Sequence, residues 1–423
     1  MKKSIYFAIL LIFITSFATG CIKEKDKNNS QIPVSTTKET VVEPEVYSVY
    51  MKSVGDIMFH EYQLRRGYDA AKKSFDFSKS FVHVEKYLRD ADYTIGNLET
   101  TFGGVNGNPD IITESRIYGF SGYPCFNTPD IAAKNIKDIG FDLLTTANNH
   151  SLDSREKGLY RTLDVLDNNG LLHVGTYRNQ EESDKIKVVE INKIKFAFVS
   201  FTYGMNGFQT PDQKDYIINH INNYDENKLE EIYAMVKKAK EEKPDIIIVM
   251  PHFGNEYWEE PSEHQERIVD SLFASGADVI LGSHPHVLQP IEVRDIVKEN
   301  GDKKKGLVIY SQGNFLSSQK FDGAHKDLGV ILGMEFNKTG DQAVTIDKIT
   351  LTPTYTYWRD DVIGIFPVDE ILEKQKSGEI QLTSLDINRM EFAQGYSVSH
   401  LLSRLTNPKL QKNGYSYEID LTK

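Results

Sequence analysis

The sequence predicts an α/β protein, in which strands and helices alternate along the chain and pack in layers. Short apolar runs recur from residue 49 to residue 310, and stretches with helical periodicity separate them. The runs 245–250 and 278–281 are apolar throughout, which is typical of strands buried on both faces. Helix-capping residues stand where several of the helical stretches begin and end.

The strands are predicted from their apolar runs and from the turns between them. Six segments are expected as strands separated by helices: 49–54, 93–98, 141–147, 245–250, 278–281 and 307–310. Segments 186–191 and 195–201 flank Asn192 and Lys193, which predicts a β-hairpin. A further pair of hairpin strands is expected between residues 329 and 354.

The helices are predicted from their caps. Thr128 followed by Pro129 indicates the start of a helix that ends at Gly140. Ser262 and Gln265 can form a capping box, and they open a helix that ends at Gly276. Further helical stretches cover 157–168 and 227–242, whereas 368–423 is more polar and has weak helix signals. We therefore expect 341–423 to be a C-terminal extension of strands and irregular chain.

Residues 1–20 have the pattern of an export signal. Lys2 and Lys3 precede an uncharged, mostly apolar run that is too short for a comfortable membrane span. Small residues come directly before Cys21, and this segment resembles the lipobox of bacterial lipoproteins. The resemblance implies cleavage before Cys21, a lipid anchor on its thiol, and a place at the extracytoplasmic face of the cell membrane. An ordinary secretory signal is the alternative. Polar residues 21–46 are expected to be a flexible tether.

Charge and cysteine content exclude several classes of protein. The chain has 61 acidic and 49 basic residues, a formal net charge of −12, which argues against a general nucleic-acid binder. Its two cysteines, Cys21 and Cys125, cannot build a disulfide framework or a cysteine-based zinc site. Any bound metal must therefore be held by His, Asp, Glu or Asn side chains.

Polar side chains that can bind a metal follow one predicted strand after another. In chain order the candidates are Asp56, Asn97, Glu99, Asn149, His150, His252, His284 and His286. The carboxyl ends of parallel strands meet at one edge of a sheet, so we expect these side chains to converge. If His284-Pro285-His286 is extended, its two imidazoles can face one ion. A mixed nitrogen and oxygen set suits Mn, Zn or Fe better than Mg or Ca. A hydrogen-bonded polar layer at the rim of the domain is the alternative.

Six motifs then resemble, in order, those of the CapA family, which is named for capsule and poly-γ-glutamate synthesis and belongs to the calcineurin-like metallophosphatase superfamily. The motifs are GDIMF at Gly55, GNLET at Gly96, ANNHSLD at Ala147, HFGNEY at His252, GSHPHVLQP at Gly282 and YSQGNFL at Tyr310. The resemblance covers about residues 46–334. It implies an αββα sandwich over 47–340 that carries a site for one or two divalent transition-metal ions.

The resemblance also implies a role for each candidate. Metal ligands would be Asp56, Asn97, Glu99, Asn149, His252, His284 and His286. His150 would contact the leaving group, so Asp56 and His150 are the expected catalytic residues. The chain departs from the family pattern at three places. Met58 stands where a histidine is usual, Glu99 or Asn97 replaces a bridging aspartate, and Arg155 replaces a glycine that many relatives carry.

Two functions are consistent with these patterns. The first is a membrane-anchored, metal-dependent hydrolase that acts on a phosphoester or an amide of an anionic polymer. The second is a non-catalytic accessory or polymer-binding lipoprotein that keeps the metal-binding fold. In both cases we expect membrane lipid, poly-γ-glutamate and capsule synthesis subunits as partners, and no nucleic acid. A solute-binding lipoprotein is a third, less specific possibility.

Overall fold

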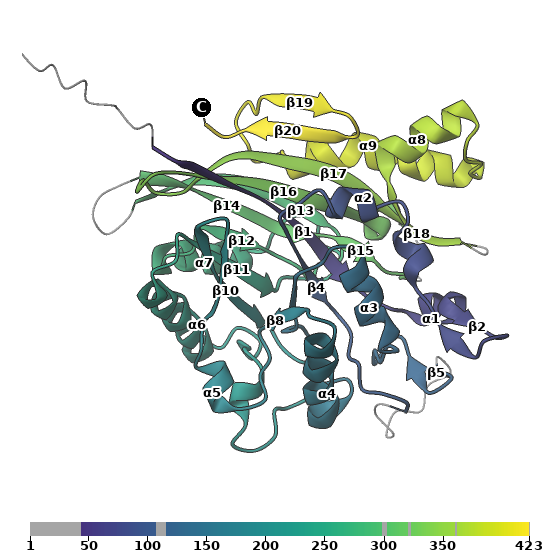
Figure 1. Cartoon of the computed structure of the whole chain (residues 1–423), viewed down its shortest axis with the longest axis horizontal. Helices are drawn as coiled ribbons and strands as arrows, with labels where there is room; N and C mark the ends of the chain where they lie inside the picture. The colour runs from purple at the N-terminus through teal and green to yellow at the C-terminus, as the bar shows by residue number, and fades with distance from the viewer. Residues whose placement is uncertain (1–43, 107–115, 298–302, 320–322, 360–361, 423) are drawn as a thin grey trace, which may run out of the picture. The chain divides into compact units, whose positions relative to one another are not determined.

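The computed structural model describes residues 44–106, 116–297, 303–319, 323–359 and 362–422. The expected signal and lipid anchor at Cys21 lie outside these residues, as does nearly all of the expected tether. Within them, two β-sheets face each other and helices cover the outer faces (Figure 1). This αββα arrangement confirms the predicted fold class. Of the helices in the described part, none is long and apolar enough to cross a bilayer.

The larger sheet has ten strands and begins with the first predicted strand. Its order is β19-β20-β17-β16-β1-β4-β7-β8, with β15 paired to β1 and β18 paired to β17. Strands β1, β4, β7 and β8 are parallel, whereas β16, β17, β18 and β20 run antiparallel to their neighbours. The bounds are β1 Val46–Ile57, β4 Tyr93–Leu98, β7 Leu143–Thr145, β8 Leu172–Val174, β15 Asn314–Leu316, β16 Leu328–Thr339, β17 Thr345–Arg359, β18 Val362–Pro367, β19 Leu410–Asn413 and β20 Ser416–Asp420.

The smaller sheet has six strands in the order β13-β14-β12-β11-β10-β9. Its bounds are β9 Lys187–Ile191, β10 Ile194–Thr202, β11 Ile246–His252, β12 Val279–Leu281, β13 Leu288–Val297 and β14 Lys303–Gln312. The predicted hairpin is confirmed as β9–β10, with Asn192 and Lys193 both at positive φ in the turn. Two further pairs of short strands are β2 Tyr68–Asp69 with β3 Ser74–Phe75, and β5 Arg116–Ile117 with β6 Phe120–Ser121.

Helices fill the connections. The α-helices are α1 Glu61–Gly67, α2 Glu85–Leu88, α3 Ile131–Asp138, α4 Arg155–Asn168, α5 Gln180–Ser183, α6 Glu226–Ala239, α7 Glu263–Ser275, α8 Val368–Ser377 and α9 Ser384–Leu401. Short 3₁₀ turns cover Ser78–Phe81, Asp215–Ile217, Lys240–Glu242 and Ala324–Asp327. The capping box of Ser262 and Gln265 is confirmed, and α7 ends at Gly276 in the left-handed conformation as predicted. Thr128 does not start its helix: its hydroxyl lies 2.7 Å from that of Thr100, and α3 begins later.

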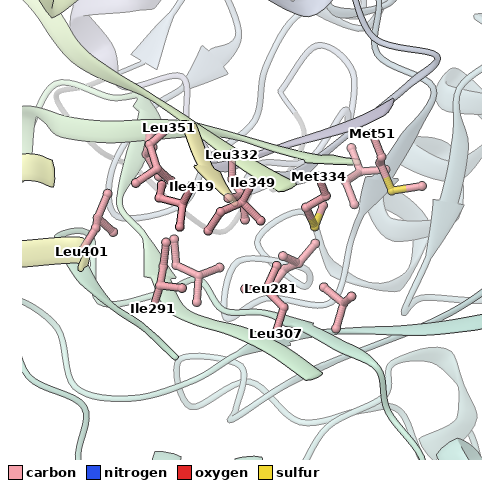
Figure 2. Packing of buried hydrophobic residues seen from close by; sticks show 14 of the residues in the cluster. Met51, Leu281, Ile291, Leu307, Leu332, Met334, Ile349, Leu351, Leu401 and Ile419 are labelled. Carbon is pink, nitrogen blue, oxygen red and sulfur yellow. The ribbon is translucent and has the colours of Figure 1, made fainter. Parts of the chain in front are cut away.

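The largest apolar core lies between the two sheets. Met51, Leu332 and Met334 of the larger sheet pack towards Leu281 and Leu307 of the smaller one (Figure 2). A second cluster packs α1 to α4 against the outer face of the larger sheet, and a third packs α6 and α7 against the smaller one. The apolar surface buried between the four layers holds the two sheets against each other, and this packing fixes how their strand ends meet.

The described residues after 340 continue the sandwich and are more regular than the sequence indicated. Strand β17 pairs along most of β16, and β20 adds to β17. Helix α9 is 18 residues long and buries Leu401 in the core between the sheets, where Ile419 of β20 also lies (Figure 2). Its start carried a signal that we did not use: the hydroxyl of Thr383 accepts a hydrogen bond from the backbone N–H of Asp386.

Two glycines let neighbouring segments of the chain approach closely at the strand ends. A β-carbon on Gly55 would lie 2.0 Å from the carbonyl oxygen of Gly313, so no side chain fits there. The same carbonyl accepts the backbone N–H of Asp56 at 3.0 Å. A β-carbon on Gly282 would lie 1.9 Å from the carbonyl oxygen of Tyr310. The end of β1 is therefore drawn against the end of β14, and the polar residues of both sheets face the same space.

Candidate metal centre

The structure brings the eight predicted site residues to one edge of the sandwich. Each is less than 5% exposed, and each lies at or just after the carboxyl end of a strand. The residues are Asp56 near the end of β1, Asn97 and Glu99 at the end of β4, Asn149 and His150 after β7, His252 at the end of β11, and His284 and His286 after β12. The expected convergence is confirmed in geometry, while the ligand role of each residue stays a prediction.

Asp56 is the most connected carboxylate of the cluster. Its Oδ1 accepts a hydrogen bond from Asn97 Nδ2 at 2.8 Å, and its Oδ2 lies 3.0 Å from His286 Nδ1. Burial raises the pKa of Asp56, but the neighbouring His286 and His252 outweigh it and hold the pKa below its usual range. Asp56 is therefore ionised at neutral pH and available to a cation.

Glu99 has the opposite surroundings. Its Oε1 is buried and has no hydrogen-bond partner among the described residues. The two nearest polar groups are His252 Nε2 at 3.5 Å and His286 Nε2 at 3.8 Å. Burial and the charge of Asp56 raise the pKa of Glu99 well above its usual value. A buried carboxylate oxygen without a partner costs folding free energy, and a bound cation would remove that cost.

His252 is held as a neutral imidazole. Its Nε2 lies 2.9 Å from Asn149 Oδ1, and its Nδ1 lies 2.9 Å from Ser283 Oγ. Burial lowers the pKa of His252 to about 3. A neutral imidazole is the form that binds transition metals, and its contacts on both ring nitrogens fix the orientation of the ring.

The pair His284 and His286 differs from expectation in its backbone. We expected an extended segment, but both residues have positive φ, at 98° and 58°, and lie in a bend. Because non-glycine residues rarely adopt such angles, the bend stores strain, which is common at functional sites. Tight packing between the strand ends imposes it. The two rings still lie near each other, with centroids 5.9 Å apart.

The two imidazoles are also electrostatically different. His284 Nδ1 is buried and finds no partner in the part of the chain that the structure describes, and burial lowers its pKa well below the usual value. For His286, burial lowers the pKa, but Glu99 and Asp56 outweigh it and raise the pKa to about 9. In the chain itself, His286 is therefore the imidazole that pairs with the carboxylate of Asp56.

His150 lies beside the cluster and pairs with Asp153. Its Nδ1 is 2.7 Å from Asp153 Oδ2, which also accepts the backbone N–H of Phe126 at 2.6 Å. Asp153 therefore fixes the orientation of the His150 ring. Burial lowers the pKa of His150, but the carboxylate of Asp153 and the charge of Glu99 raise it above the usual value.

Two groups of side chains have ligand atoms close enough to hold a cation, within 4.8 Å of one another. One group is Asp56, Glu99 and His252, and all three are buried. The other is Glu256, His284 and His286, of which Glu256 is exposed. Carboxylates and imidazoles with two orphaned buried atoms fit a divalent transition metal, as expected from the residue types. Asn97 and Asn149 contact the first group: Asn97 Nδ2 donates to Asp56 Oδ1, and Asn149 Oδ1 lies 2.9 Å from His252 Nε2.

Sequence reasoning missed two residues of this edge. Glu256 stands in the motif HFGNEY, but only the first histidine of that motif was taken as a candidate. Asn314 stands in YSQGNFL: its Oδ1 lies 3.1 Å from His286 Nδ1, and its Nδ2 donates to the carbonyl oxygen of His286. In both cases the signal was a polar residue within a strand-end motif.

Other residues considered from the sequence lie around the centre. His60 and His264 were left out of the site: His60 Nδ1 accepts the backbone N–H of Ser318, and the exposed His264 stacks on Tyr224. Arg155 has φ of 58°, which explains why a glycine suits that position.

Comparisons with known proteins agree with the motifs. The chain is 28% identical to the Bacillus subtilis (strain 168) protein named "PGA biosynthesis protein CapA" over 356 residues, which are 83% of this chain and 82% of that protein. It is 28% identical to the Bacillus anthracis "Capsule biosynthesis protein CapA" over 272 residues, which are 64% of this chain and 60% of that protein, less than two thirds of its length.

Among solved structures, the calcineurin-like phosphoesterase YfkN from Bacillus subtilis aligns with a TM-score of 0.40 and 14% identity, covering 83% of this chain and all of that one. A putative 5'-nucleotidase from Staphylococcus aureus aligns with a TM-score of 0.40 and 13% identity, covering 82% of this chain and 58% of that one. The model of the family described as "Bacterial capsule synthesis protein PGA_cap" matches residues 51–319, more than half of the chain. The chain therefore belongs to this family of bacterial capsule synthesis proteins.

Proposed function

We propose that this chain is a metal-dependent hydrolase of capsule or poly-γ-glutamate synthesis, tethered to the outer face of the cell membrane through a lipid on Cys21. The observation that carries the proposal is the buried cluster of carboxylates and imidazoles at the strand ends. Two of its atoms, Glu99 Oε1 and His284 Nδ1, have no protein partner among the described residues. A purely structural polar layer would pair these atoms with protein donors and acceptors.

A divalent transition-metal ion held here would supply a Lewis acid that polarises a phosphoester or an amide. The residues that would hold it are Asp56, Glu99 and His252, with His284 and His286 beside them. Asn97 fixes the two carboxylates, because its Nδ2 donates to Asp56 Oδ1 at 2.8 Å and to Glu99 Oε2 at 3.3 Å. The ligand atoms are therefore positioned before a cation arrives.

His150 is the residue that we assign to proton transfer. Because Asp153 engages Nδ1 of the ring, Nε2 is the atom left to hold or release a proton towards the leaving group. The carboxylate of Asp153 raises the pKa of His150 against the effect of burial, which favours the protonated ring. Asp153 thereby sets both the tautomer and the orientation of the imidazole.

The substrate class follows from the family and from charge. Relatives of the chain are named for the biosynthesis of capsule and of poly-γ-glutamate, which supports an anionic polymer as the substrate. The chain itself carries a net charge of −12 and would repel such a polymer over most of its surface. A bound cation would give the strand-end edge the local positive charge that contact with a polyanion requires. Subunits of capsule or poly-γ-glutamate synthesis are the partners that we propose.

The test uses the full chain, purified in detergent. Metal content is measured by elemental analysis, and turnover is measured with a chromogenic phosphoester and with poly-γ-glutamate. We expect bound transition metal and turnover in the wild type, loss of turnover in His284→Ala, and wild-type behaviour in His264→Ala, a matched histidine outside the site. Metal and polymer binding without turnover would establish the accessory function instead, and a metal-free chain would overturn both.

A further inference from the structure

The loop that follows β11 carries a carboxylate to the strained histidine pair. The backbone N–H of Phe253 donates to the carbonyl oxygen of Ser283 at 3.0 Å, and that of Tyr257 donates to the carbonyl oxygen of Pro285 at 2.8 Å. The loop is therefore hydrogen-bonded to the bend that holds both imidazoles. Glu256 lies between these two attachment points, and its place beside the pair is set by the main chain.

The loop is shaped for this approach. Gly254 has φ of 106°, and a β-carbon there would lie 2.6 Å from the side chain of Gln265, so only glycine fits. Tyr257 has φ of 66°, a rare conformation for an aromatic residue. The strained backbone at Tyr257, next to Glu256, lies across from the strained backbone at His284 and His286. Such strain persists where the surrounding structure enforces it, and it is frequent at ligand-binding sites.

A second and independent observation points to a ligand at this place. One ligand atom each of Glu256, His284 and His286 lies within 4.8 Å of the other two. His284 is 3% exposed, and its Nδ1 has no partner within the described residues. The nearby residues after Asp56 offer no other imidazole, because Met58 is apolar and His60 Nδ1 accepts from Ser318. Glu256 is the carboxylate that completes a set of three ligands.

Resting on the proposed metal centre, we propose that Glu256 is a metal ligand, and that Glu256, His284 and His286 form a second, exchangeable metal position beside the buried position of Asp56, Glu99 and His252.

The two positions differ in ways that predict different affinities. The buried position has two carboxylates away from water, where their attraction for a divalent cation is strongest. The second position has one carboxylate, and that carboxylate is exposed to solvent. Ordering an exposed glutamate side chain costs conformational entropy, and water competes for the cation. When metal is added, it should therefore fill the buried position first. When metal is removed, it should leave the Glu256 position first.

The experiment is a Mn²⁺ titration of the chelator-treated full chain, followed by calorimetry and by elemental analysis after desalting. We expect two ions per wild-type chain, one tight and one weaker. In Glu256→Gln the dissociation constant of the weaker ion should rise roughly tenfold or more, while that of the tight ion stays unchanged. Glu256→His, which replaces one ligand with another, should restore the weaker ion. The control is Glu263→Gln, an exposed carboxylate in the first turn of α7.

Two results would overturn the inference. The first is that Glu256→Gln binds both ions with wild-type affinity. The second is that Glu256→Gln loses both ions although its circular dichroism and its thermal unfolding match those of the wild type. The outcome is separate from that of the proposed function. Two ions of unequal affinity without any turnover would uphold this inference while the hydrolase fails. A wild-type chain that binds no Mn²⁺ would overturn both.

Discussion

Two buried glutamates in this protein have opposite surroundings. Glu370 of α8 is 3% exposed and accepts hydrogen bonds from Lys86 Nζ at 2.8 Å and Tyr87 OH at 2.7 Å, with Lys374 Nζ also 2.7 Å away. Glu99 is fully buried, and its Oε1 has no partner in the described part of the chain. The pKa of Glu370 falls to about 2, because its three partners outweigh its burial, whereas burial raises that of Glu99 well above the usual value.

The contrast between these two glutamates distinguishes a buried carboxyl group that stabilises the fold from one that serves the candidate metal centre. At Glu370 the chain satisfies a buried charge with its own donors, and the pairing joins α8 to α2. At the strand ends the chain leaves a buried carboxyl oxygen of Glu99 without a partner and surrounds it with imidazoles, so a bound cation would stabilise the site. Buried polar residues that lack partners are therefore the better guide to the functional edge of this fold.

The largest effect is expected at the residue assigned to proton transfer. His150→Gln should lower turnover by about a hundredfold or more, because it removes the proton donor while leaving the ligands in place. Metal content should stay at the wild-type value. Turnover and elemental analysis on the same preparation check this expectation. Retained turnover would remove His150 from the mechanism, and lost metal would make it a part of the ligand set.

The next effect is the loss of stabilisation by metal at Glu99. Mn²⁺ at a hundred times its dissociation constant should stabilise the wild type by about 2.7 kcal/mol. In Glu99→Gln this stabilisation should disappear, whereas the metal-free chain should keep its free energy of unfolding or gain up to about 1 kcal/mol. Thermal unfolding with and without Mn²⁺ measures both quantities. Equal stabilisation of variant and wild type would show that Glu99 does not face the cation.

Glu370→Gln should show the reverse behaviour. Removing the charge that Lys86 and Lys374 face should lower the free energy of unfolding by about 2 kcal/mol, a modest value because both lysines are partly exposed. Stabilisation by Mn²⁺ should be unchanged. Urea unfolding with and without metal tests both points. A variant as stable as the wild type would mean that the pairing at α8 contributes nothing.

The smallest effect is the pH dependence of that pairing. The pKa of Glu370 is about 2 in the folded chain and 4.5 ordinarily, so the unfolded chain takes up the proton first as the pH falls. The contribution of Glu370 to stability is therefore complete above about pH 4.5 and is lost between pH 4.5 and pH 2. The difference in unfolding free energy between wild type and Glu370→Gln should shrink over that range. If this difference in unfolding free energy grew as the pH fell, the predicted sign of the pH dependence would be wrong.

Much of the fold and of the site could be predicted because local patterns encode it. The apolar runs marked the strands, and the polar residues after them marked the edge where the ligands meet. Ser262 and Gln265 gave the start of α7 because a capping box involves residues only three positions apart. Placing eight side chains at one edge required only the rule that parallel strands end together.

The rest depends on contacts between distant residues. The bend at His284 and His286 follows from packing between strand ends, and no periodicity in the sequence signals positive φ at a histidine. Glu256 reaches the histidines through backbone hydrogen bonds of its loop across 30 and 28 residues of sequence, which a motif read by itself does not reveal. Helix α9 was underestimated because the cap at Thr383 was overlooked in a polar stretch.

The central claim is that the strand ends of both sheets hold a divalent transition metal through buried carboxylates and imidazoles. The most direct test is elemental analysis of the desalted full chain and of Asp56→Asn, which keeps the shape of the side chain but removes its charge. We predict bound transition metal in the wild type and its loss in Asp56→Asn. A wild-type chain without metal, or equal metal in both proteins, would contradict the account.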